Sequence, residues 1–179
     1  LKIHIALLQE TILPKNSKFH LTGYTMYHCE CDKCQGIATL VRNDIMAEVS
    51  HKETNDETDI QEVKVQRNGM ELKIFNVYCP PRNNLLFDYN SSDFKHTILA
   101  GDFNGHSPLW GYKDTNATGH AIEEIIRSTN LILLQSDRTP PTLLHRASGT
   151  TSRPDLTLVS ADMQPHCSMT VLDDMGSDH

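Results

Sequence analysis

Residues 97–104 read Thr-Ile-Leu-Ala-Gly-Asp-Phe-Asn and place an acid directly behind a short apolar run. The run Thr97–Ala100 predicts a buried strand, and Gly101 permits a tight turn immediately before the acid. Asp102 and Asn104 are therefore expected where a strand ends. Such positions hold side chains on a rigid base at a rim built from loops, where binding and catalytic sites usually lie.

Other predicted strands also carry acidic or polar residues at their ends. They are Glu10 after the run 5–9, Tyr78 at the end of an alternating arm, Asp155 before the run 156–159, and Asp178 with His179 at the end of the chain. With Asp102 and Asn104 they supply the parts needed for metal-assisted hydrolysis of a phosphate ester. Each acid taken alone is more simply interpreted as a solvated turn or cap residue, so the hypothesis depends on the whole set.

The remaining pattern predicts a strand-rich chain. Asn68-Gly69 between two alternating runs predicts a hairpin with a type I′ turn, and the apolar stripe within 118–129 predicts a helix. Residues 50–59 are almost wholly polar and predict a loop, as do residues 105–117 and 136–152. With about seven or eight strands and one helix, we expect an α/β sandwich with long loops at one rim.

Composition limits the class of protein. The 179 residues carry a formal charge of −7, with 38% hydrophobic and 22% charged residues, which excludes collagen, coiled coil and an acidic disordered tail. We expect a single domain over residues 1–179. No apolar run approaches the ~20 residues of a membrane span, so no membrane partner is expected. The acidic balance argues against a basic nucleic-acid coat but not against a metal-dependent nuclease.

The ordered motifs resemble those of the endonuclease/exonuclease/phosphatase superfamily, which has the DNase I-like fold. More narrowly, residues 104–111 look like the endonuclease domain of non-LTR retrotransposons, notably jockey and R1-like elements. The residues that carry the resemblance are Gln9-Glu10-Thr11, Asn76-Val77-Tyr78-Cys79-Pro80-Pro81, Gly101-Asp102-Phe103-Asn104, Gly149-Thr150-Thr151-Ser152-Arg153-Pro154-Asp155-Leu156 and Ser177-Asp178-His179. The resemblance implies a four-layered α/β sandwich of two mostly antiparallel sheets flanked by helices.

The resemblance also assigns a role to each matched residue. Glu10 would be the main Mg²⁺ ligand, with Asp178 beside the metal, and Mn²⁺ is the alternative ion. Asp102 would activate the attacking water, while Asn104, Tyr78 and Ser177 would contact the phosphate. His179 would stabilise the charged phosphorane, with Asp155 bonded to its other ring nitrogen.

The reaction implied by the resemblance is a nick in double-stranded DNA that leaves a 3′-hydroxyl. In such elements this hydroxyl primes synthesis by a reverse transcriptase domain, which we expect downstream in the same polyprotein. A nuclear location follows from that substrate. The five cysteines, an odd number without a secretory leader, likewise indicate a reducing intracellular compartment.

Two alternatives stay open. The first is another phosphoesterase of the same fold, such as an abasic-site endonuclease or an inositol-phosphate phosphatase. The second is a catalytically inactive retroelement remnant. The family usually begins with an Asn-bearing strand and a helix, and its last strand continues past the histidine, so we expect this chain to be a fragment truncated at both ends.

Two further features have competing interpretations. Cys29, Cys31 and Cys34 could hold zinc, but a second pair of ligands is not evident, which favours a variable surface loop. Trp110 could contact DNA or anchor the loop that follows Asn104, and we favour the anchor.

Overall fold

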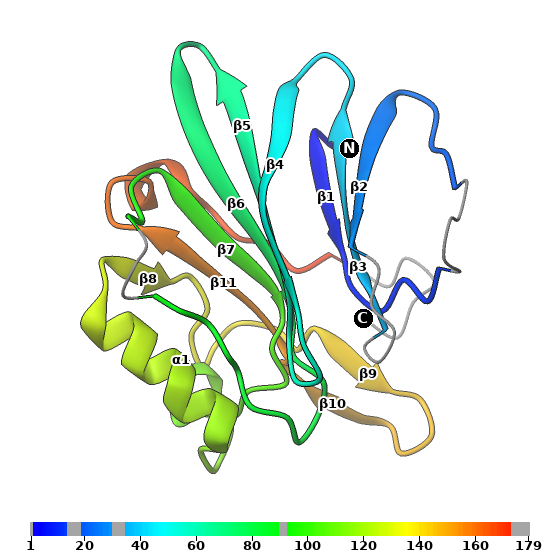
Figure 1. Cartoon of the computed structure of the whole chain (residues 1–179). Coiled ribbons are helices and arrows are strands. Elements are labelled where there is room, and N and C mark those ends of the chain that lie inside the picture. The colour runs from blue at the N-terminus through cyan, green and yellow to red at the C-terminus, as the bar shows by residue number, and fades with distance from the viewer. Residues whose placement is uncertain (1, 14–18, 30–34, 90–92, 173–179) are drawn as a thin grey trace.

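Two packed β-sheets and one helix make up most of the protein (Figure 1). The structure, a computed structural model, describes residues 2–13, 19–29, 35–89 and 93–172. In this part of the chain the layers are one α-helix, a six-stranded sheet and a three-stranded sheet. The predicted α/β sandwich is confirmed.

The six-stranded sheet has the order β4-β5-β6-β7-β11-β8, and all its neighbours are antiparallel except β6 and β7. Because a parallel pair needs a crossover, the chain leaves this sheet between β6 and β7 through residues 79–96. The strands are β4 (Met46–Thr54), β5 (Asp59–Arg67), β6 (Met70–Tyr78), β7 (Thr97–Asp102), β8 (Leu131–Leu133) and β11 (Asp155–Ser160).

The three-stranded sheet, in the order β1-β3-β2, packs on β5 and β6. Its strands are β1 (Ile5–Leu8), β2 (Tyr24–Cys29) and β3 (Ile37–Arg42). Val41 of this sheet meets Val63, Val65 and Ile74 of the larger sheet in one apolar cluster. Burial of these branched side chains holds one end of the two sheets together.

Helix α1 (Ala117–Ser128) covers the opposite face of the six-stranded sheet (Figure 1). Ile122 and Ile125 of its apolar stripe are buried in the main core, as predicted from their spacing. The short helices η1 (Pro108–Trp110) and η2 (Gln164–His166) complete the helical elements of the described residues. No helix there is both long and apolar enough to span a membrane.

The loop after Asn104 is anchored by Trp110. Its side chain is fully buried in the main core, and its Nε1 donates to the Gly105 carbonyl at 2.9 Å. A buried indole needs such a partner. The anchoring interpretation of Trp110 is confirmed.

The predicted Asn68-Gly69 hairpin is present. Asn68 and Gly69 have φ values of 52° and 76°, and β5 pairs with β6 up to Arg67 and Met70 beside the turn. Two positive φ values in succession are what a type I′ turn requires.

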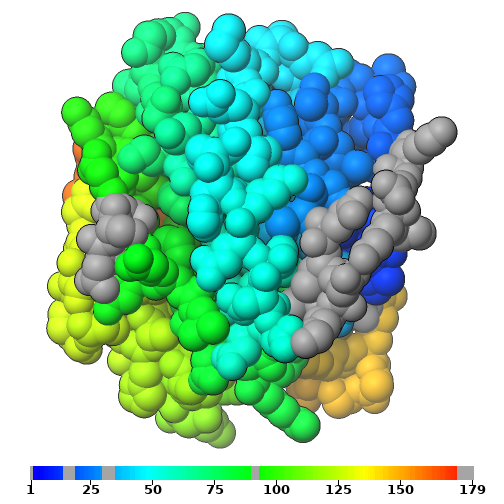
Figure 2. All heavy atoms as spheres, viewed as in Figure 1, coloured from blue at the N-terminus to red at the C-terminus, as the bar shows by residue number. Residues whose placement is uncertain are grey.

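Two of the predicted loops are wrong. Strand β4 runs through residues 46–54 and β5 begins at Asp59, so most of the predicted loop 50–59 is strand. Strand β4 is an edge strand of its sheet and exposes much of its length. Figure 2 shows this cyan segment across the middle of the visible face. Polar residues are tolerated on such an edge strand, so composition hides it. The predicted loop 136–152 contains a hairpin of β9 (Leu143–His145) and β10 (Thr150–Ser152).

Gly101 permits the close approach of β7 to β6. Its φ is 152°, and a Cβ at this position would lie 1.9 Å from the Val77 carbonyl oxygen. Since Val77 pairs directly with Gly101 in the parallel ladder, no flexible side chain can move aside to relieve the contact. Glycine is therefore required by space as well as by backbone conformation.

We expect Gly101→Ala to lower the free energy of unfolding by about 3 kcal/mol or more, because the methyl group must push the parallel strands apart. Gly149→Ala is the matched control. Gly149 also has a positive φ, 67°, but nothing would lie within 4 Å of a Cβ added to it. This substitution should cost only about 1 kcal/mol of backbone strain. Urea unfolding measures both, and equal losses would contradict the steric argument.

Candidate functional site

Three site residues stand side by side where β6, β7 and β11 meet. Tyr78 ends β6 and pairs with Asp102 at the end of β7, and Asp102 pairs with Asp155 at the start of β11. Directly paired residues on neighbouring strands project to the same face of a sheet. The backbone register therefore places the phenol and both carboxyl groups in one row, as the strand-end pattern predicts.

Glu10 joins this row from the other sheet. It lies two residues beyond the end of β1, and the buried Tyr78 hydroxyl donates to its Oε1 at 2.7 Å. Its φ is 51°, an uncommon value for a residue other than glycine. The following segment is held by Thr11 N–H on the Gly36 carbonyl at 3.1 Å. Glu10 itself is exposed, so its carboxylate can be reached from solvent.

Asp102 and Asn104 form a tight local unit. Asp102 is 4% exposed, and its Oδ1 accepts from the Asn104 backbone N–H at 3.0 Å. Asn104 also has a positive φ, 46°, and its Nδ2 donates to the Cys79 carbonyl at 3.1 Å. Strained non-glycine residues persist only where their surroundings hold them, and they concentrate at functional sites.

Asn76 links the two sheets just behind the row. Its Nδ2 donates to the Ala38 carbonyl at 3.1 Å and to the Leu8 carbonyl at 3.3 Å, and its Oδ1 accepts from Gln9 Nε2 at 2.6 Å. Asn76 is fully buried. The amide therefore fixes the end of β1, and with it the position from which Glu10 reaches Tyr78.

Asp155 is half-buried in its place beside Asp102. Its backbone is held by Thr142 Oγ1 at 3.4 Å and by Gln135 Nε2 at 3.2 Å. Its predicted partner His179, together with Asp178 and Ser177, lies outside the described residues. The structure thus brings together Glu10, Tyr78, Asp102, Asn104 and Asp155 of the predicted set.

The donor chemistry fits a hard cation. Within residues 2–13, 19–29, 35–89 and 93–172, no three His, Cys, Asp or Glu side chains gather as a metal-binding group. Glu10 nevertheless presents an exposed carboxylate that accepts from Tyr78, and Tyr78 in turn pairs with Asp102 on the neighbouring strand. Mg²⁺ is commonly bound through one or two carboxylates while it keeps several waters.

The cysteines give no support for zinc in the described residues. Cys29 is buried beside Ile37 and Tyr78, while Cys31 and Cys34 of the proposed cluster lie outside the described part. Burial raises the pKa of the Cys79 thiol, which follows Tyr78. A raised pKa keeps this thiol protonated and makes it a poor metal ligand or nucleophile.

Tyr112, at the rim of the site, is a residue that the sequence motifs did not indicate. Tyr112 stacks on His106 with ring centroids 4.1 Å apart, and its hydroxyl accepts from the Arg153 N–H at 3.0 Å. Burial raises the pKa of Tyr112, so it stays a neutral phenol. Arg153 Nε donates to the Thr139 carbonyl at 2.6 Å and packs over Gly111. Arg153 therefore joins the loop that contains Gly111 to the loop that contains Thr139.

A family model described as "Endonuclease-reverse transcriptase" matches residues 72–179, which is more than half of the chain. The match includes β7, β11 and all but the first two residues of β6, the three strands that carry the row. None of the curated proteins matches the chain.

Solved structures with a similar fold include "Endonuclease domain of TRAS1, a telomere-specific non-LTR retrotransposon". The TM-score is 0.75 at 23% identity, over 99% of this chain and 82% of that one. A structure of D. rerio TDP2 with a single-strand DNA product has a TM-score of 0.57 at 14% identity, over 89% and 72%. A humanized D. rerio TDP2 gives 0.56 at 13%, over 88% and 70%. These similarities confirm the DNase I-like fold.

We expect Asn76→Ala to lower the free energy of unfolding by about 2–4 kcal/mol, because it leaves buried carbonyl groups of both sheets without their donor. The control is Gln66→Ala, which removes an exposed amide that donates to Glu71 at 2.9 Å. Its cost should stay within about 0.5 kcal/mol. Urea unfolding compares the two, and a loss at Asn76 no larger than the control would contradict the inter-sheet role.

Proposed function

The chain belongs to the endonuclease-reverse transcriptase family, and we propose that it nicks double-stranded DNA by hydrolysing one phosphodiester bond. The observation that carries the proposal is the row of Tyr78, Asp102 and Asp155, with Glu10 bonded to Tyr78 from the second sheet. A rigid row of acids at a strand end suits attack by water on a phosphate ester.

The chain's own residues divide the chemistry among them. Asp102 accepts a proton from the attacking water, and the Asn104 N–H on its Oδ1 keeps this carboxylate in place. The second hydrogen of Asn104 Nδ2 donates to a phosphate oxygen, since the first goes to the Cys79 carbonyl. The Tyr78 hydroxyl orients Glu10, and the contact proposed for it is with the phosphate. The role proposed for Asp155 is to orient the imidazole of His179, which would stabilise the charge that develops on the phosphate.

Magnesium is the proposed cofactor. Glu10 would hold it, with Asp178 beside it, and Mn²⁺ is the expected substitute. When bound, a divalent cation supplies positive charge that stabilises the developing oxyanion.

The proposed nick leaves a 3′-hydroxyl that primes reverse transcription in a non-LTR retrotransposon. The family description supports a reverse transcriptase as the associated domain, and the TRAS1 similarity supports a retrotransposon endonuclease. Chromosomal DNA as the substrate would place the protein in the nucleus. The β9–β10 hairpin, which leads directly into Arg153 and Asp155, gives this site a projecting rim against a duplex (Figure 1).

We expect the full chain to convert supercoiled plasmid into nicked circles with Mg²⁺, and to lose this activity in EDTA. Asp102→Asn should lower the rate by about 10²–10⁴-fold, because the amide cannot accept the proton of the attacking water. Gel analysis of the plasmid forms gives the rate.

Asp44→Asn is the matched control. Asp44 is exposed in the turn between β3 and β4, and Arg42 lowers the pKa of its carboxyl to about 2. It should nick at the wild-type rate. Nicking that survives EDTA, or that Asp102→Asn leaves intact, would contradict the proposal. Cleavage of abasic-site DNA but not of intact plasmid would favour the repair-type alternative.

A further inference from the structure

Three hydrogen bonds hold Asn104, two through its backbone and one through its side chain. Its N–H donates to Asp102, its Nδ2 donates to Cys79, and its carbonyl oxygen accepts from Asn116 Nδ2 at 2.9 Å. The positive φ of 46° costs free energy for any residue but glycine. These three bonds stabilise that conformation, and two of the partners lie at or next to the ends of the site strands.

The third partner, Asn116, comes from outside the row. We propose that Asn116 is a positioning residue for hydrolysis, which holds the Asn104 backbone so that the Asn104 side chain and Asp102 keep their catalytic geometry. This inference rests on the proposed nuclease function. Asn116 is the N-cap residue of α1. Through it, the helix holds residues 102–106, which we call the catalytic turn.

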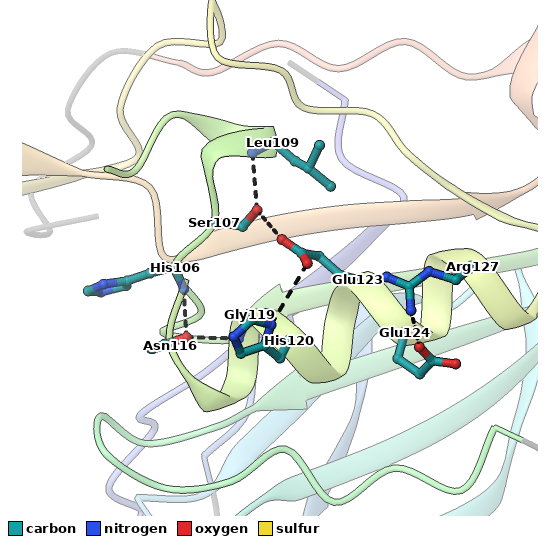
Figure 3. A network of polar contacts seen from close by, with 9 residues as sticks. All are labelled: His106, Ser107, Leu109, Asn116, Gly119, His120, Glu123, Glu124 and Arg127. Atoms are coloured by element: carbon teal, nitrogen blue, oxygen red, sulfur yellow. Dashed lines mark hydrogen bonds and ion pairs between the residues drawn. The ribbon is translucent and has the colours of Figure 1, made fainter. Parts of the chain in front are cut away.

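The hydrogen-bond partners of Asn116 determine the orientation of its side-chain amide. Its Oδ1 accepts from the N–H groups of His106 at 2.9 Å and Gly119 at 2.8 Å (Figure 3). Its Nδ2 donates to the Asn104 carbonyl at 2.9 Å. The reversed amide would set an NH₂ group against two N–H donors and a carbonyl against a carbonyl. One orientation alone satisfies the three contacts.

The catalytic turn rests directly on the first turn of α1. The Asn116 N–H donates to the His106 carbonyl at 3.3 Å, so these two residues exchange a pair of hydrogen bonds. A Cβ on Gly119 would lie 1.8 Å from the same carbonyl oxygen. Only glycine at this helix position lets residues 104–106 come so close.

A second contact fixes the same loop one residue further on. The buried Ser107 hydroxyl donates to Glu123 Oε1 at 2.5 Å and accepts from the Leu109 N–H at 3.1 Å (Figure 3). Glu123 lies two turns along α1 from Asn116. The loop is therefore held at two points of one rigid helix, and Asn116 is the point that reaches Asn104.

The side chain of Asn116 has two separable functions. Its oxygen caps the helix, which aspartate and serine also do well. Its NH₂ group donates to Asn104, which aspartate cannot do and serine is too short to do while it caps. Asn116→Asp and Asn116→Ser should thus keep α1 intact and release the Asn104 carbonyl. In the aspartate variant a carboxylate oxygen would also face that carbonyl and repel it.

The test measures nicking kinetics and amide hydrogen exchange on the full chain. For both variants we expect kcat to fall about 100-fold with little change in KM, since a small displacement of a catalytic group is costly. The amides of residues 102–106 should exchange about tenfold faster, while those within α1 keep their protection. Asn130→Asp is the matched control, because it adds the same charge at an exposed position just beyond the other end of α1.

The outcomes separate this inference from the proposed function. Wild-type kcat and exchange in either variant would overturn the positioning role. Loss of protection along α1 in both variants would also overturn it, because it would reduce Asn116 to a helix cap. If the wild-type chain does not nick DNA, the proposed function fails, and the exchange of residues 102–106 alone then decides whether Asn116 holds Asn104.

Discussion

The parallel pairing of β6 with β7 is the constraint on which the site depends. Among the residues that the structure describes, it is the one parallel pair of the six-stranded sheet, and it ends with Tyr78 opposite Asp102. Gly101 makes the joint possible because its backbone meets Val77 where no side chain fits. Tyr78 and Asp102 are thereby fixed by the hydrogen bonds of the parallel ladder, and their distance does not depend on a flexible loop.

The other groups of the site are positioned next to the β6–β7 pair by different kinds of contact. The polar layer around Asn76 brings Glu10 from the other sheet, and the antiparallel ladder adds Asp155. Helix α1 supports the turn after Asp102 through Asn116. Apolar burial joins the sheets at both ends, through Val41 at one and through Cys29 and Ile37 against Tyr78 at the other, and hydrogen bonds of Asn76 join them near the site. Hydrogen bonds are directional, so they position groups more sharply than apolar packing does.

The sequence predicted those elements that a short run of neighbouring residues determines. Asn68-Gly69 encodes its turn, and the stripe around Ile122 and Ile125 encodes its helix. Strand β4 was missed because an edge strand can carry polar residues along its length. The row of Tyr78, Asp102 and Asp155 was expected from strand ends and a family resemblance, but its register is a property of tertiary pairing. Asn116 gave no separate signal, because in the sequence it is one more polar residue before a helix.

The order of contacts along the chain has a consequence for how the molecule is made. Strands β4, β5 and β6 are joined by successive hairpins, so they can pair as soon as they are synthesised. Glu10, Tyr78, Asp102 and Asp155 are far apart in sequence, and bringing them together requires the closure of long loops. In a nascent chain, strands β4, β5 and β6 can therefore pair well before the residues of the site come together. The row can be complete only after β11, which carries Asp155, has left the ribosome.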